Sequence, residues 1–352
     1  MTPLHDLLIR RIRATGPITL ADYMADCLLH PQHGYYATRD PFGAAGDFTT
    51  APEISQMFGE LVGLALAQSW LDQGAPTPFT LAELGPGRGT LMADLLRATR
   101  AVPGFHAACR LHLIEASPVL QTRQVEALNG FPCTWATDAN HLPDQTLFAV
   151  ANEFFDALPI RQFTRDPAGW RETLIGEADG TLTPGLSAAA PLAALSHRTA
   201  DTAPGDIVET CPTALPIIAT LGQRIQTHGG AALIIDYGAW GSNGDTFQAL
   251  QAHSYTNPVT APGLADLTAH VDFQALAAAS PTAHAFTDQG SYLSKLGIAQ
   301  RSARLAAQLQ GVAQESHLAA TRRLTAPSEM GSLFKVLALY PANAPPPPGL
   351  DG

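Results

Sequence analysis

The sequence has few of the features that mark membrane, secreted or nucleic-acid-binding proteins. No apolar run reaches the length of a bilayer span, and no small-residue cleavage site follows an apolar N-terminal stretch. Acidic residues outnumber basic ones by 31 to 20, and only two of the basic residues are lysines. Binding by phosphate neutralisation needs the opposite charge balance. We therefore expect a cytoplasmic (bacterial) protein that does not bind nucleic acid and has no stable membrane insertion.

Cysteine is also scarce. No C-x-x-C pair occurs among the four cysteines, Cys27, Cys109, Cys133 and Cys211. This spacing argues against a disulfide scaffold and against a thiolate zinc site. Cys27, His30 and His33 fall at intervals of three, but Pro31 interrupts any helix that would align them. We therefore expect no metal site.

A glycine-rich turn containing Gly85, Gly87 and Gly89 follows an apolar strand and precedes a segment with helical spacing. Glycines let backbone N–H groups approach a ligand closely. The spacing lacks the final glycine of the dinucleotide-binding pattern and the Gly-Lys-Ser/Thr ending of a P-loop, which disfavours a nicotinamide-dependent oxidoreductase. Glu83 would repel a pyrophosphate and suits a ligand with a cationic end, such as S-adenosylmethionine. The alternative is a tight turn that binds nothing.

From residue 79 onward, strand-like and helix-like segments alternate, which predicts an α/β fold with a parallel sheet covered on both faces. The expected strands are 79–84, 110–114, 147–151, 231–236, 284–287 and 333–339, with a weaker strand ending near residue 137. The expected helices are 4–13, 20–29, 90–99, 118–128, 213–227 and 272–279. A further helix is predicted to begin at a Thr50–Glu53 capping box and to end near residue 71.

The domain plan has three parts. We expect an N-terminal helical extension over residues 1–75, a main domain over 76–340 and a disordered proline-rich tail over 341–352. Turn signals within the main domain predict an insertion at about 160–205 that begins as an antiparallel meander. A second insertion, at 291–326, is expected to be mostly helical.

Polar residues end the predicted strands, where open parallel sheets bind their ligands. Glu115 follows the second strand and could accept hydrogen bonds from both ribose hydroxyls of a nucleoside. Asp138 follows the weaker strand and is a candidate for the adenine amine, with a solvated turn aspartate as the alternative.

The fourth strand leads into an acidic and aromatic loop that contains Asn152, Glu153 and Asp156. In methyltransferases built on such a sheet, the transferred methyl group lies at this position. If the nucleophile that receives the methyl group were a guanidinium nitrogen, Glu153 and Asp156 could hold the cation and orient its lone pair, since free arginine does not deprotonate. The alternative is helix capping by Asn152 or Asp156. His270 is a candidate base or orienting group, although a lone histidine can equally be structural.

Several long motifs together closely resemble the MidA family, whose mitochondrial members are complex I assembly-factor methyltransferases. These motifs are His33–Tyr36, Gly46–Glu60, Glu83–Thr90, Asn152–Pro159, Asp236–Gly238 and Asp266–Phe273.

The resemblance implies a Rossmann-like, seven-stranded class I methyltransferase sheet with S-adenosylmethionine as cofactor. It implies that the Gly46–Glu60 segment, with Asp47, Phe48 and Thr49, closes over the cofactor. It further implies a protein substrate, namely methylation of an arginine on a respiratory complex I subunit during assembly. The alternative is a non-catalytic assembly chaperone that keeps the fold. The sequence is compatible with a homodimer and does not identify the acceptor.

Overall fold

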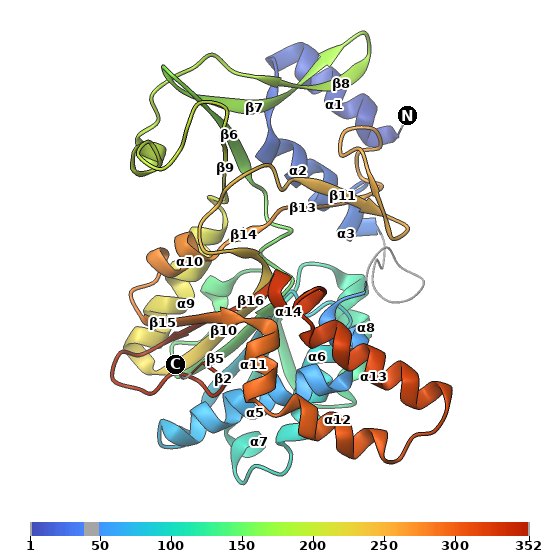
Figure 1. Ribbon diagram of the computed structural model, residues 1–352, viewed down its shortest axis with the longest axis vertical. Helices are drawn as coiled ribbons and strands as arrows, with labels where there is room; N and C mark the ends of the chain where they lie inside the picture. Colours follow the sequence, from blue (N-terminus) through green and yellow to red (C-terminus); the bar gives the residue numbers. More distant parts are fainter. Residues whose placement is uncertain (1, 39–48, 351–352) are drawn as a thin grey trace. The chain divides into compact units, whose positions relative to one another are not determined.

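The computed structural model describes residues 2–38 and 49–350 and divides them into two compact units (Figure 1). Unit 1 draws on residues 2–38, 156–215 and 239–272, and unit 2 on residues 49–155, 216–238 and 273–350. Residues 49–75, which we had grouped with the N-terminal helices, therefore belong to unit 2.

Within the described residues, unit 2 contains a seven-stranded sheet in the order β15-β16-β10-β5-β2-β3-β4. All neighbouring strands are parallel except at β16, which is antiparallel to both β10 and β15. This order confirms the expected Rossmann-like methyltransferase sheet. The strands are β2 (Phe79–Leu84), β3 (Cys109–Ile114), β4 (Cys133–Ala136), β5 (Leu147–Asn152), β10 (Gly230–Ala239), β15 (Ala283–Asp288) and β16 (Phe334–Tyr340).

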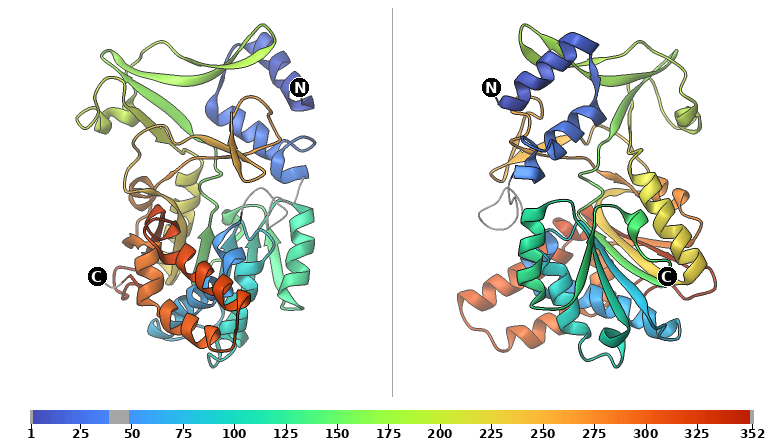
Figure 2. Two further views of the ribbon diagram at one scale, coloured as in Figure 1. Left: turned by 45° about the vertical axis from the view of Figure 1, so that its right-hand side comes forward. Right: turned by 180° about the vertical axis from the view of Figure 1, so that it is seen from behind.

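Helices cover both faces of this sheet (Figure 2). Side chains alternate between the faces along each strand, so Leu81, Phe148 and Leu233 join one core cluster with residues of α5 and α6. Helix α10 packs against β16. The helices are α4 (Ala51–Ile54), α5 (Gln56–Asp72), α6 (Thr90–Thr99), α7 (Phe105–Ala108), α8 (Pro118–Leu128), α9 (Ala214–His228), α10 (Phe273–Ala279), α11 (Gln289–Lys295), α12 (Ile298–Ala306), α13 (Val312–Thr325) and α14 (Met330–Leu333), with a 3-10 turn, η1 (Ala139–His141).

The helix expected from Thr50 to residue 71 is two helices, because the chain is extended at Ser55 and begins α5 there. The Thr50 side chain makes no capping hydrogen bond. Glu53 instead accepts a hydrogen bond from Thr90 Oγ1, the first residue of α6, at 2.6 Å. The predicted Thr50–Glu53 capping box is therefore wrong, because a tertiary contact takes the Glu53 carboxylate.

Unit 1 consists of α1 (Pro3–Thr15), α2 (Leu20–Leu29), α3 (Tyr35–Thr38), η2 (Ala193–Arg198) and short strands. An antiparallel sheet joins β1 (Ile18–Thr19), β7 (Gly169–Ala178), β6 (Arg161–Asp166) and β9 (Ile207–Thr210), and β8 (Thr181–Leu186) pairs with β7. This pairing confirms the predicted meander. A smaller sheet contains β11 (Gln248–Gln251), β12 (Ser254–Thr256) and β13 (Asp266–Thr268), and β14 (Val271–Asp272) follows.

The proline-rich tail differs from the expectation of disorder. Leu350 is buried in the main core cluster of unit 2, and Gly349 packs closely against the Tyr292 ring. Proline restricts the backbone φ angle but does not prevent the chain from packing against a core. Across the described chain, no helix combines the length and the hydropathy that a bilayer span requires.

Candidate functional site at the carboxyl ends of the strands

The glycine turn between β2 and α6 has a backbone that only glycine adopts easily. Gly85 and Gly89 have φ angles of 63° and 83°, in the left-handed region. A Cβ on Gly85 would also lie 2.7 Å from Cδ2 of Phe154. The turn therefore needs glycine both for its conformation and for the close approach of the loop after β5. Gly87, with a φ of 52°, completes the predicted set.

Glu83 lies at the end of β2 with only 3% of its surface exposed. Its Oε2 atom is buried and has no hydrogen-bond partner among the described residues. Burial, and then the charge of Glu115, raises the pKa of Glu83 to about 8. A buried carboxyl group without a partner is costly, so this side chain is suited to receive a polar or cationic ligand group.

Glu115 follows β3 and is held in place by the start of α8. Its Oε1 accepts the backbone N–H of Ser117 at 2.7 Å, and its Oε2 accepts Gln124 Nε2 at 3.2 Å. Burial raises the pKa of Glu115, and these hydrogen bonds oppose that rise. Glu83 and Glu115 interact electrostatically, so the two predicted cofactor carboxylates lie near each other.

Asn152 ends β5, and Glu153 follows it with a left-handed φ of 51°, which is unusual for a non-glycine residue. Glu153 Oε1 accepts hydrogen bonds from Asn152 Nδ2 at 3.0 Å and from the backbone N–H of Ala51 at 2.9 Å. Asn152 Oδ1 is buried, with no hydrogen-bond partner within the described part of the chain. This loop therefore contacts α4 and leaves an amide oxygen for a ligand.

Asp236 of β10 organises the same loop. It is fully buried, and its Oδ2 accepts the backbone N–H groups of Phe154 and Phe155 at 3.2 and 3.0 Å. Asp236 belongs to the Asp236–Gly238 motif, and its residue type alone did not indicate this role. Here its carboxylate fixes the backbone that brings Phe154 against the glycine turn.

The other two predicted catalytic residues, Asp156 and His270, belong to unit 1. The backbone carbonyl of Asp156 accepts the N–H of Ala269 at 3.0 Å, which brings the two chain segments together. The backbone N–H of His270 donates to Thr246 Oγ1 at 2.8 Å, and burial lowers the pKa of its imidazole. Asn152 and Glu153, in contrast, belong to unit 2.

Tyr36 lies close to Asp156 in unit 1. Its hydroxyl donates to Asp266 Oδ1 at 2.8 Å. Burial, followed by the charges of Asp266 and Asp156, raises the pKa of Tyr36 well above its ordinary value. Two largely buried carboxylates thus lie near one tyrosine hydroxyl.

The remaining predicted cofactor residues are Asp138, Asp47, Phe48 and Thr49. Asp138 is exposed and caps η1, where its Oδ1 accepts the N–H of Asn140 at 2.7 Å. This is the turn role weighed as its alternative, and its adenine role stays a prediction. Thr49 is the first described residue of unit 2, whereas Asp47 and Phe48 lie outside the described residues.

Sequence reasoning missed Gln124, which is fully buried on α8. The signal was present, because Gln124 stands one helical turn from Leu120 and one from Leu128, both buried. Glu209 was also missed. It accepts hydrogen bonds from Thr246 in unit 1, but a lone acidic residue in a short strand carries no comparable signal.

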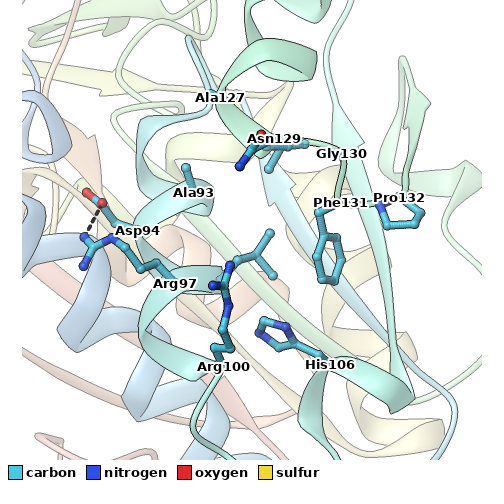
Figure 3. A pocket seen from close by; sticks show the side chains of 12 residues that line it. Ala93, Asp94, Arg97, Arg100, His106, Ala127, Asn129, Gly130, Phe131 and Pro132 are labelled. Carbon is cyan, nitrogen blue, oxygen red and sulfur yellow. Dashed lines mark hydrogen bonds and ion pairs between the residues drawn. The ribbon is translucent and has the colours of Figure 1, made fainter.

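A cavity of about 520 Å³ lies elsewhere in unit 2, among Arg97, Arg100, His106 and Phe131 (Figure 3). It adjoins the C-terminal ends of α6 and α8, and residues 129–132 on its wall lead into β4. It therefore borders the amino ends of the strands. Ligands of open parallel sheets bind at the opposite ends, so we assign no cofactor to it.

Among the described residues, no group of three or more His, Cys, Asp or Glu side chains is arranged to hold a metal ion.

Comparison with known proteins gives consistent findings. Residues 61–291 match the Methyltransf_28 family model, which describes S-adenosyl-L-methionine-dependent methyltransferases. The protein arginine methyltransferase NDUFAF7, mitochondrial, of Bos taurus is 38% identical, over 97% of this chain and 84% of the relative. Its Homo sapiens counterpart is 37% identical, with the same coverage. These matches confirm the family expected from the motifs.

A solved structure agrees with these matches. A COG1565 superfamily member from Burkholderia thailandensis, bound to S-adenosyl-homocysteine, is 28% identical and has a TM-score of 0.81. The match covers 99% of this chain and 92% of that one.

The expectation of a bacterial cytoplasmic location is wrong. The similar curated proteins from Bos taurus, Homo sapiens and Drosophila melanogaster are named as mitochondrial. Composition and charge carry no signal that separates these compartments.

Proposed function

This chain belongs to the family of S-adenosyl-L-methionine-dependent methyltransferases, and from this premise we propose that it methylates an arginine side chain of a protein. Its cofactor is S-adenosylmethionine. The named activity of the similar mitochondrial proteins supports the choice of arginine.

The observation that carries the cofactor assignment is the pair of carboxylates beside the glycine turn. Glu83 Oε2 is buried without a partner among the described residues, and it can accept from a cationic group. The Glu115 carboxylate accepts hydrogen bonds from the backbone N–H groups of Ser117 and Ala116 and from the Gln124 amide, and it keeps capacity for a ribose hydroxyl. The residues present therefore fit a nucleoside with a positively charged end.

When bound, S-adenosylmethionine would supply an electrophilic methyl carbon, to which the acceptor nitrogen bonds as the carbon–sulfur bond breaks and S-adenosylhomocysteine leaves as a neutral thioether. The chain must hold the acceptor nitrogen in line with that methyl group, and positioning of this kind supplies much of the acceleration. We assign Glu153 and Asp156 to hold the guanidinium, as predicted from their residue types. Asn152 Oδ1 is a further acceptor for a polar hydrogen.

Methylation of a guanidinium releases one proton, because the attacking nitrogen needs its lone pair. His270 is the proposed acceptor of that proton. Burial lowers the pKa of its imidazole, which favours the neutral form that a base requires.

Three further assignments complete the proposal. Asp138 would accept a hydrogen bond from the adenine amine. Asp47, Phe48 and Thr49 would contact the cofactor as part of the segment that closes over it. Thr49 leads directly into α4, which is tied to α6 through Glu53 and Thr90.

We also propose that the acceptor is a subunit of respiratory complex I during assembly, and that the enzyme acts as a homodimer. The first rests on the resemblance to the MidA motifs. The second is compatible with the sequence and is tested by light scattering of the purified protein.

The arginine claim is tested with methyl-labelled S-adenosylmethionine and purified complex I subunits. Acid hydrolysis of the labelled protein should release methylarginine in the presence of the wild-type enzyme. Glu115→Ala should abolish it, whereas Glu126→Ala, which changes an exposed carboxylate on α8, should not. Label in another amino acid, or only in small molecules, would refute the arginine assignment. Normal complex I assembly with Glu153→Gln and Asp156→Asn would favour the non-catalytic chaperone.

A further inference from the structure

A buried amide connects three parts of the proposed cofactor site in unit 2. Gln124 Nε2 donates to the backbone carbonyl of Gly87 at 2.8 Å and to Glu115 Oε2 at 3.2 Å. Gln124 Oε1 accepts the indole N–H of Trp135 at 2.7 Å. One side chain therefore contacts the glycine turn, the acidic residue after β3 and a residue of β4.

The orientation of this amide is fixed by its partners. The Trp135 indole nitrogen can only donate, so it must face the amide oxygen. The Gly87 carbonyl and the Glu115 carboxylate accept, so they must face the two amide hydrogens. A flipped amide would lose all three contacts and would place like dipoles together.

The burial of Gln124 makes these contacts costly to break. Its side chain is fully buried, on the same face of α8 as Leu120 and Leu128. A buried amide without partners is strongly disfavoured. The helix backbone at Gln124 also approaches the turn, since a Cβ on Gly89 would lie 3.3 Å from Gln124 Cα.

We propose that Gln124, oriented by Trp135, is a positioning residue for the cofactor, which holds the Glu115 carboxylate and the Gly87 carbonyl in the geometry that receives the nucleoside. The contacts use one acceptor position on Glu115 Oε2, while the Ser117 N–H uses one on Oε1. Each carboxylate oxygen has about two such positions. The backbone N–H of Ala116 also donates to this carboxylate, so about one of its four acceptor positions is left for a ribose hydroxyl.

This inference rests on the proposed cofactor site at Glu115 and is independent of the acceptor. It is tested by calorimetric titration of the full chain with S-adenosylhomocysteine. Gln124→Met keeps the length of the side chain and removes all three hydrogen bonds. We expect its affinity to fall about tenfold, which corresponds to about 1.4 kcal/mol.

The matched control is Gln121→Met, one turn earlier on α8. Gln121 Nε2 donates to the backbone carbonyl of Glu115, at 3.0 Å, rather than to its carboxylate. We expect its affinity to stay within about threefold of wild type, a difference of less than 1 kcal/mol. Equal losses for the two variants, or no loss for Gln124→Met, would overturn the proposal.

A second readout needs no activity and covers a failure of Gln124→Met to fold. The indole N–H resonance of Trp135, identified by its absence in Trp135→Phe, should shift when S-adenosylhomocysteine is added to the wild-type protein. Trp135→Phe should weaken binding by about threefold, because it frees the amide oxygen but leaves Gln124 in place. An unmoved resonance together with unchanged affinity in Trp135→Phe would overturn the role of Trp135.

Glu115→Ala separates the two levels of the account. Unchanged binding in Glu115→Ala would show that the cofactor site itself is misplaced. Weakened binding in Glu115→Ala with normal binding in Gln124→Met would leave the site intact and would refute the positioning role alone.

Discussion

The buried carboxyl group of Glu83 makes the stability of the ligand-free protein depend on pH. Burial, and then the charge of Glu115, raises its pKa from 4.5 to about 8 in the folded state. The unfolded chain therefore releases this proton near pH 4.5, whereas the folded chain keeps it until about pH 8. The folded state binds more protons in this window, so stability falls as pH rises through it.

The size of the effect follows from the shift. Each pKa unit corresponds to about 1.36 kcal/mol. The contribution of protonated Glu83 to the free energy of unfolding is therefore about 4 kcal/mol smaller at pH 8 than at pH 5. Glu83→Gln keeps a neutral side chain of the same size at every pH. The unfolding free energy of Glu83→Gln, relative to wild type, should therefore rise by about 4 kcal/mol between pH 5 and pH 8.

The assay is urea unfolding of both proteins, followed by circular dichroism at several pH values between 5 and 8.5. Glu126→Gln is the matched control, since Glu126 is exposed on α8. A constant difference between Glu83→Gln and wild type across this range would refute the reasoning. So would an equal pH dependence in the control.

Three further outcomes are expected. Thr90→Val removes the 2.6 Å hydrogen bond to Glu53 and should cost about 1.5 kcal/mol of unfolding free energy; urea unfolding within about 0.3 kcal/mol of wild type would contradict this. Gly85→Ala places a Cβ 2.7 Å from Phe154 Cδ2, at a residue with a left-handed backbone. We expect a loss of about 2 kcal/mol of unfolding free energy, seen as a lower melting temperature. An unchanged melting temperature would contradict this. Burial raises the pKa of Glu60, but hydrogen bonds from its two arginine partners outweigh this and lower it. The stability that ionised Glu60 contributes is therefore lost as pH falls below about 4.5. The unfolding free energies of Glu60→Gln and wild type should converge in acid. A difference between them that grows in acid would contradict the role of the ion pairs.

The sheet and its helices were largely predictable because local signals mark their ends. Helix 118–128 begins after a Ser-Pro cap and ends at Asn129, whose left-handed backbone stops it. Strand 79–84 ends at the glycine turn. In each case the sequence carries both a periodic apolar pattern and a residue type that terminates it.

The predictions of a Thr50–Glu53 capping box and of a disordered tail were wrong because of tertiary contacts. The Glu53–Thr90 contact joins residues 37 positions apart, whereas the break at Ser55 is local, because the Ser55 side chain accepts the N–H of Met57 and caps α5. The tail was misjudged because its prolines were weighed above Leu350, which packs into the core. Local pattern cannot report either contact.

The candidate site divides in the same way. Glu83, Glu115 and the glycines were found because strand ends in a parallel sheet share one edge. Asp156 and His270 fall in a unit assembled from three separated chain segments, and no local pattern specifies that assembly. Gln124 was predictable in principle, as a polar residue on a buried helical stripe.

The most direct test of the account is a crystal structure of this chain with S-adenosylhomocysteine. We expect the ribose hydroxyls within about 3 Å of the Glu115 carboxylate, beside the glycine turn at the end of β2. A ligand bound instead in the cavity between the ends of α6 and α8, or one with no contact to Glu115, would contradict the central claim.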